Sequence, residues 1–177
     1  MELIPKEVKE TLDRLIHEIA EDSSLCARNP KRDFTRKRKL PVERVISILL
    51  GMGKDALPDE LIAHFNYAAD AASAPAFVQQ RAKLRPEAME ALFQQFSEAF
   101  PNERLYRDYR LLATDGCDIR IPLNPEDSET FFPVSDDKKP YNITKIGALY
   151  DLVNRVYVDA LVEGKMLPTK TKCWWKW

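Results

Sequence analysis

Apolar residues recur with a helical period through the first hundred positions of the chain. After Pro5 they fall every three or four residues, which predicts a helix with one buried face; they are Val8, Leu12, Leu15, Ile16 and Ile19. The same period predicts further helices over 42–52, 58–65, 74–84 and 86–100, each beginning at or beside a proline, which fits a first helical turn. The pattern predicts a small helical bundle.

After Pro101 the period changes to two, which indicates strands. A strand is predicted over 109–122, with Asp115 and Asp118 on opposite faces. The residues expected to share the face of Asp115 are Leu111, Ala113, Cys117 and Ile119.

A polar loop over 124–140 comes next. Residues 143–153 and 156–162 then predict a hairpin that turns at Asn154 and Arg155, a weaker turn signal than Asn-Gly.

Asp115 is an acid within an apolar strand, where a carboxylate costs free energy unless a cation, an Arg or hydrogen-bond donors compensate it. The residues alone leave two interpretations. Asp115 pairs with a neighbouring Arg, such as Arg110 or Arg120, or it is a metal ligand. Structural ion pairs are the commoner reason for an acid in such a place.

The net charge of −1 over 177 residues conceals a basic segment at 31–39. Its basic residues are Lys31, Arg32, Arg36, Lys37, Arg38 and Lys39, opposed only by Asp33, so the rest of the chain is acidic. Such a cluster predicts contacts with nucleic-acid phosphates. A solvated loop between helices is the alternative.

Residues 59–84 could also form a helix-turn-helix, with Gln79, Gln80 and Arg81 facing a DNA groove. Two packed helices with a polar outer face explain the same pattern. Both interpretations stay open at this point.

Five stretches, taken in order, resemble one known family. They are Arg32-Asp33-Phe34-Thr35-Arg36-Lys37-Arg38-Lys39-Leu40-Pro41, Thr114-Asp115-Gly116-Cys117-Asp118-Ile119-Arg120-Ile121-Pro122, Lys139-Pro140-Tyr141-Asn142, Ala148-Leu149-Tyr150-Asp151-Leu152 and Tyr157-Val158-Asp159-Ala160-Leu161-Val162. The chain up to Gly164 thereby resembles the N-terminal part of bacterial insertion-sequence transposases with a DDE triad, most closely the insertion-sequence-four family.

The resemblance implies an α+β fold. Residues 1–104 would form a helical, DNA-binding domain, and 105–164 the start of an RNase H-like catalytic domain, an incomplete antiparallel sheet of three strands. The resemblance also implies that Asp115 is the first catalytic carboxylate and a Mg²⁺ ligand. In the complete family enzyme, two such ions about 4 Å apart activate the attacking oxygen and stabilise the leaving one.

Residues 165–177 depart from the family and are interpreted as an aberrant tail, because they lack an amphipathic stripe and place Trp174, Trp175 and Trp177 at an open end. A frameshift near Leu167 is the proposed cause. The expected product is a truncated transposase fragment that binds the terminal inverted repeats and is inactive alone. The alternative is a non-catalytic DNA-binding protein or an inhibitor of an intact transposase, acting as a homo-oligomer or in mixed complexes.

Cysteine usage and hydropathy set the expected compartment. Cys26, Cys117 and Cys173 lack the spacing of a metal site, and the sequence has no membrane-length apolar run or signal peptide. The expected location is cytoplasmic and nucleoid-associated, with no membrane partner.

Overall fold

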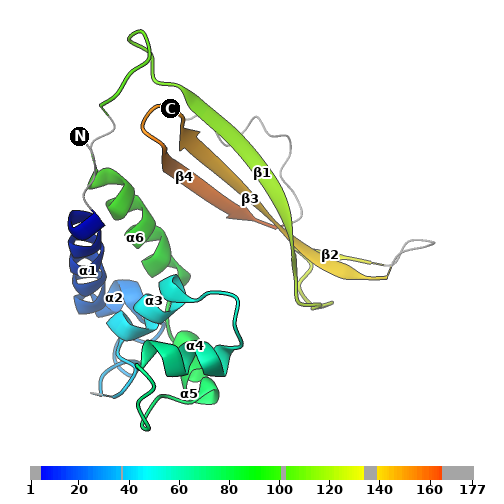
Figure 1. Cartoon of the computed structure of the whole chain (residues 1–177). Helices are drawn as coiled ribbons and strands as arrows, with labels where there is room; N and C mark the ends of the chain where they lie inside the picture. The colour runs from blue at the N-terminus through cyan, green and yellow to red at the C-terminus, as the bar shows by residue number, and fades with distance from the viewer. Residues whose placement is uncertain (1–4, 37, 101–102, 134–138, 165–177) are drawn as a thin grey trace. The chain divides into compact units, whose positions relative to one another are not determined.

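The computed structural model describes residues 5–36, 38–100, 103–133 and 139–164 (Figure 1). The chain divides into two compact units, 1–100 and 101–177, a few residues before the boundary predicted at 104. Helices make up the first unit and an antiparallel sheet the second, which confirms the α+β class.

Six helices are found in the described part of the first unit, which we call the helical unit. They are α1 (Pro5–Glu21), α2 (Ser23–Cys26), α3 (Val42–Gly51), α4 (Leu57–His64), α5 (Ala74–Arg81) and α6 (Pro86–Glu98). All five predicted helices are present, although α5 ends before Leu84. The short α2 is additional. It follows from Asp22, whose carboxylate accepts hydrogen bonds from the backbone N–H groups of Ser24 (2.9 Å) and Leu25 (3.2 Å) and so caps the helix.

One apolar core holds this unit together. The predicted stripe of α1 is buried at Leu15, Ile16 and Ile19, and it packs against α3 and α6. Phe77 of α5 is fully buried in the same core. Burying side chains of this size stabilises a fold by about 1.5–3 kcal/mol each before entropy is subtracted.

A short backbone pairing joins two segments of the helical unit that are distant in sequence. Ala27 forms an antiparallel bridge with Leu84. The N–H of Arg28 donates to the carbonyl of Lys83 (2.9 Å), and the N–H of Arg85 donates to that of Cys26 (2.9 Å). The segment that leads into the basic residues therefore lies beside the end of α5.

The described residues of the second unit form an antiparallel sheet of four strands, rather than the three expected. They are β1 (Leu112–Ile121), β2 (Phe131–Phe132), β3 (Tyr141–Asp151) and β4 (Val156–Glu163). The long β3 is central, with β1 on one edge and β4 on the other, and β2 pairs with the first residues of β3. The predicted β3–β4 hairpin is confirmed. The RNase H-like assignment stays a prediction.

Two buried polar side chains organise the ends of β3. Asn142 accepts from the N–H of Asn124 (2.8 Å) and donates to the carbonyl of Asn124 (2.9 Å) and the hydroxyl of Thr130 (2.8 Å), so it fixes the loop before β3. Asp151 accepts from the backbone N–H groups of Val153 (3.0 Å) and Asn154 (2.8 Å), so it fixes the β3–β4 turn.

Candidate nucleic-acid interface

Most of the predicted basic residues lie around one hollow in the helical unit. This pocket, which we call the basic pocket, has a volume of about 520 Å³. Its charged lining consists of the cations Lys31, Arg32, Arg36, Arg38 and Lys83 and the single carboxylate Asp33. The sequence segment and the end of α5 thus contribute to the same concave, positively charged surface.

The chain around Asp33 explains why an acid stands within this basic segment. Asp33 is only 8% exposed, and its carboxylate accepts hydrogen bonds from the backbone N–H (3.0 Å) and the side-chain amide (3.3 Å) of Asn29. These bonds close a turn, since the N–H of Asp33 donates in return to the carbonyl of Asn29 (2.8 Å). Asp33 therefore shapes the loop, while the cations beside it are exposed.

Phe34 anchors the basic segment to the core. Its φ of 57° lies in the left-handed region, which is uncommon for a residue with a side chain. The half-buried ring packs against the apolar core of the helical unit. Because Phe34 packs against the core, the loop is fixed there, and Arg32 and Arg36, two residues away on either side, are exposed.

Lys83 belongs to the basic pocket but was not among the predicted DNA-binding residues. Its ammonium group donates to the side-chain oxygen of Gln80 at 3.3 Å. The backbone hydrogen bond from Arg28 to Lys83, described above, brings Lys83 beside the basic segment. No spacing within 31–39 could indicate this contribution, because the pairing joins segments far apart in sequence.

Lys39, at the end of the basic segment, has a separate role. Its ammonium group lies 3.0 Å from the carboxylate of Asp70 and donates to the backbone carbonyl of the same residue (2.7 Å). The hydrogen bond from Lys39, together with its charge, lowers the pKa of Asp70. Lys39 therefore ties the segment to the α4–α5 connection. Lys37 lies outside the described residues.

The helix-turn-helix expectation does not agree with the positions of the three predicted residues. Gln79 and Arg81 are exposed, but Gln80 between them is 8% exposed and contributes to the basic pocket. Consecutive helical residues point about 100° apart, so the three cannot share one groove-facing surface. The connection from α4 to α5 also runs from Phe65 to Ser73, longer than the 3–4 residues typical of such a turn.

Asp115 lies in β1, as predicted, but its surroundings differ from the expectation. The residue is exposed, so the desolvation cost that singled it out in the sequence is absent. Its carboxylate accepts a hydrogen bond from the N–H of Gly116 (2.8 Å). Neither proposed Arg partner is engaged with it, because Arg110 pairs with Asp151 at 2.9 Å and Arg120 stacks over Tyr141.

The strand register determines what surrounds Asp115 on its face of the sheet. Across the strands it is aligned with Ala148 of β3 and then Ala160 of β4, neither of which offers a ligand atom. Asp118 is aligned with Lys145 and lies on the opposite face, as predicted. Among the described residues, no group of three or more His, Cys, Asp or Glu side chains could hold a metal ion. Mg²⁺ prefers oxygen ligands, and of these three aligned residues only Asp115 offers a side-chain oxygen.

The chain was compared with protein-family models, curated proteins and solved structures. No family model matches the chain, and no curated protein or solved structure shows significant similarity to it. Within the described part of the chain, no helix has both the length and the apolar character needed to cross a membrane.

Proposed function

We propose that this chain binds duplex DNA through the phosphate backbone at the basic pocket. The observation that supports the proposal is the gathering of five cations, from 31–38 and from Lys83, around one hollow of about 520 Å³. Arg and Lys side chains bind phosphate oxygens by charge-assisted hydrogen bonds, and a guanidinium can do so with two parallel bonds. Such contacts fix the position of a protein on DNA without reading its bases.

The biological setting we propose is transposition of an insertion sequence. It is supported by the resemblance of 32–41 and of the segments from 114 to 162 to the insertion-sequence-four transposases. In that setting the helical unit binds the terminal inverted repeats. Asp115, on an exposed strand of the second unit, is the residue that we assign to the family's first catalytic carboxylate.

The salt dependence of duplex binding tests this proposal. If about five phosphates are contacted, the logarithm of the affinity should fall with the logarithm of salt concentration at a slope of about −4 to −5. The triple variant Lys31→Ala, Arg36→Ala, Arg38→Ala should make that slope shallower by about 3, because three counterion-releasing contacts are lost.

The matched control removes the same charge elsewhere on the helical unit. Lys6, Lys9 and Lys54 are exposed and lie outside the basic pocket, so their triple substitution by Ala should leave the slope within about 1 of the parent value. An equal loss of slope in both triple variants, or no loss in either, would refute the assignment of the interface.

A further inference from the structure

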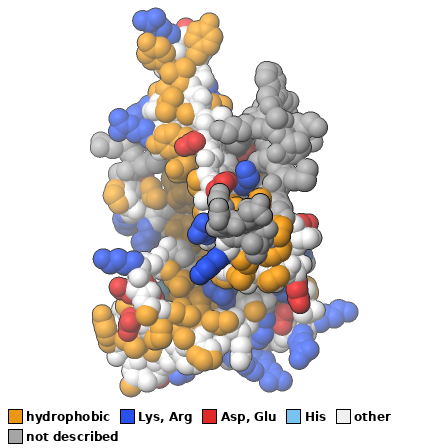
Figure 2. Space-filling view, turned by 90° about the vertical axis from the view of Figure 1, so that its right-hand side faces the viewer, with side chains coloured by type: hydrophobic (Ala, Val, Ile, Leu, Met, Phe, Trp, Pro, Cys, Tyr) orange, Lys and Arg blue, Asp and Glu red, His pale blue; other side chains and the backbone are white. Residues whose placement is uncertain are grey.

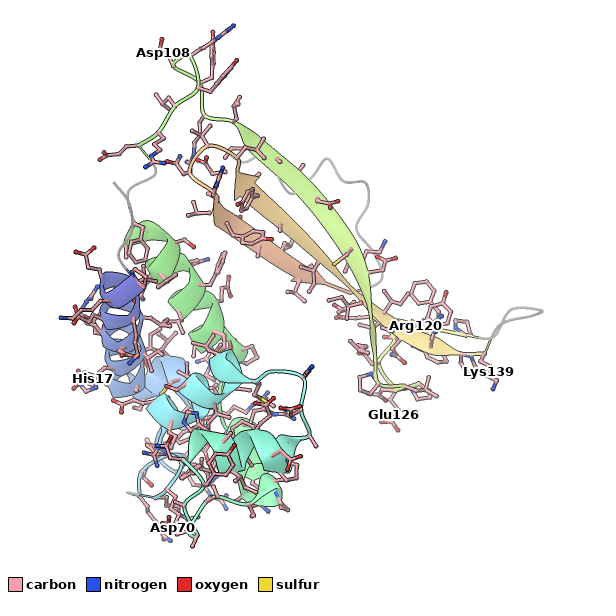
Figure 3. All side chains as sticks on the ribbon, viewed as in Figure 1. His17, Asp70, Asp108, Arg120, Glu126 and Lys139 are labelled. Atoms are coloured by element: carbon pink, nitrogen blue, oxygen red, sulfur yellow. The ribbon has the colours of Figure 1, made fainter. Side chains whose placement is uncertain are left out.

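A tight hairpin precedes β1 in the second unit. Tyr106 and Tyr109 exchange both backbone hydrogen bonds, at 2.9 and 3.0 Å, around the central residues Arg107 and Asp108. Those two residues have φ values of 48° and 65°, as a two-residue hairpin of type I′ requires. Figure 3 labels Asp108 at the tip of this hairpin.

The local sequence does not favour this turn. A type I′ turn usually contains Asn-Gly or a similar pair, because side chains disfavour the left-handed region. Here both positions carry side chains, Arg107 and Asp108, so the backbone is strained.

Contacts on both sides of the hairpin hold it in place. Before it, the backbone of Arg104 makes two hydrogen bonds of 3.1 Å with the side chain of Asn154. After it, the guanidinium of Arg110 donates to the buried Asp151 at 2.9 Å. The β3–β4 turn, which contains Asp151 and Asn154, therefore fixes both ends of the hairpin.

The fixed hairpin exposes aromatic rings. Tyr109 is 71% exposed and Tyr106 is 51% exposed, and as directly opposed residues they lie on the same face of the hairpin. The guanidinium of Arg107 stacks over the ring of Tyr106, 5.3 Å from its centroid. Figure 2 shows hydrophobic and basic side chains together at the upper end of the view, where this hairpin stands in Figure 1.

We propose that this hairpin stacks on unpaired nucleobases of DNA, an inference that rests on the proposed DNA binding. Every base has a flat π-face that a Tyr ring can cover, and an Arg stacked beside it adds attraction for the base and its phosphate. A stable protein partner needs about 800 Å² of surface on each side, which a two-residue turn does not offer. A single base needs only one ring, and Tyr109 supplies it.

Two otherwise identical duplexes distinguish stacking from phosphate binding. One carries a short single-stranded overhang of thymidines, and the other carries the same overhang with abasic sugars. The parent chain should bind the thymidine overhang roughly 5-fold or more tightly, the effect expected of one stacked base. Tyr109→Ala should abolish that preference, whereas Tyr109→Phe, which keeps the ring, should retain it.

Tyr157→Ala is the matched control, since Tyr157 is a similarly exposed tyrosine on β4 of the same unit. It should leave the preference unchanged. Photocrosslinking of the unmodified chain to an overhang that contains 5-iodouracil gives a readout without substitutions, and it should attach the base to Tyr106 or Tyr109.

The outcomes separate the two proposals. Salt-dependent duplex binding through the basic pocket without any preference for bases would overturn only the role of the hairpin. A crosslink confined to other residues, or a preference that survives in Tyr109→Ala, would do the same. Absence of all DNA binding would overturn both proposals.

Discussion

The two units of the chain are held together in different ways. Nearly all of the buried hydrophobic residues that the structure describes belong to the helical unit, and Leu149 is the exception in the sheet. Among the described residues of the sheet unit, the fully buried side chains are instead the polar Asn142 and Asp151. The helical unit is therefore stabilised mainly by apolar burial, while the described sheet depends on a few hydrogen-bonded side chains at the ends of its central strand.

The difference implies that substitutions in the two units should have different signatures. In a packed core, the loss of volume sets the loss of stability. In a sheet whose first strand is largely exposed, the loss of a buried acceptor leaves several donors without partners. We make four predictions, from the largest expected effect to the smallest.

Phe77→Ala should destabilise the helical unit by about 3–5 kcal/mol, because the fully buried ring is lost and a cavity remains. Chemical denaturation combined with amide hydrogen exchange would measure this effect for each unit separately. Amide protection should fall in α1, α3 and α6 and stay unchanged in β3.

Val78, the neighbour of Phe77 and 41% exposed, is the control. Val78→Ala should change stability by no more than about 0.5 kcal/mol. Equal effects of the two substitutions would contradict the assignment of the core.

Asp151→Ala should destabilise the sheet unit by about 2–3 kcal/mol, because Arg110 and the turn amides of Val153 and Asn154 lose their acceptor. Exchange of the β3 and β4 amides should accelerate, while the helical amides keep their protection. Asp118→Ala is the control, since this exposed carboxylate 3.6 Å from Lys145 should contribute no more than about 0.5 kcal/mol.

The same carboxylate makes the sheet sensitive to acid. Burial acts to raise the pKa of Asp151, but the hydrogen bonds from Asn154 and Arg110 outweigh it, and the pKa lies below its usual value of 3.8. Its contribution to stability is therefore present above pH 3.8 and lost as the pH falls through the lowered pKa. This acid sensitivity should be absent from Asp151→Asn, and its persistence there would assign it to other groups.

The smallest predicted effect concerns the two histidines of the helical unit, whose pKa values should move in opposite directions. A hydrogen bond with Glu43, 2.5 Å from Nδ1, and the charge of Glu21 raise the pKa of His17 above 6.5. Burial, with the nearby charge of Arg44, lowers that of His64 below 6.5. NMR titration of the ring protons would measure both values.

Glu43→Gln should lower the pKa of His17 and leave that of His64 unchanged. The stability that His17 gains from its partners is fully present below pH 6.5 and is lost as the pH rises through its raised pKa. A His17 that titrates below His64 would contradict the contact between α1 and α3.

The sequence predicts the parts of this fold that depend on local order. The stripe that begins at Val8 predicts α1, and the two strands around Asn154 predict the hairpin, because periodicity and turn residues act over short distances. The basic segment 31–39 is visible for the same reason. The contribution of Lys83 to the lining of the basic pocket could not be predicted, because it depends on the pairing of Ala27 with Leu84, which are far apart in sequence.

Asp115 shows a second limit of prediction from sequence. Alternation assigns it correctly to one face of a strand, but cannot tell whether another element covers that face. The apolar neighbours suggested burial, and the described structure leaves the residue exposed. Likewise, the charge of Arg110 could be matched to several acids, and only the geometry of the β3–β4 turn pairs it with Asp151.

The cluster around Asn142 has a consequence for how this chain can vary during evolution. Asn142 is bound to Asn124 and Thr130, and the hydroxyl of Thr130 donates in turn to Asp127 (2.6 Å). The bonds to Asn124 go to its backbone, so changes at Asp127, Thr130 and Asn142 are the ones that leave hydrogen-bonding side chains of the cluster without partners. The effects of these three changes should be strongly non-additive. Among relatives of this chain, these three side chains should be inherited as a set or replaced as a set.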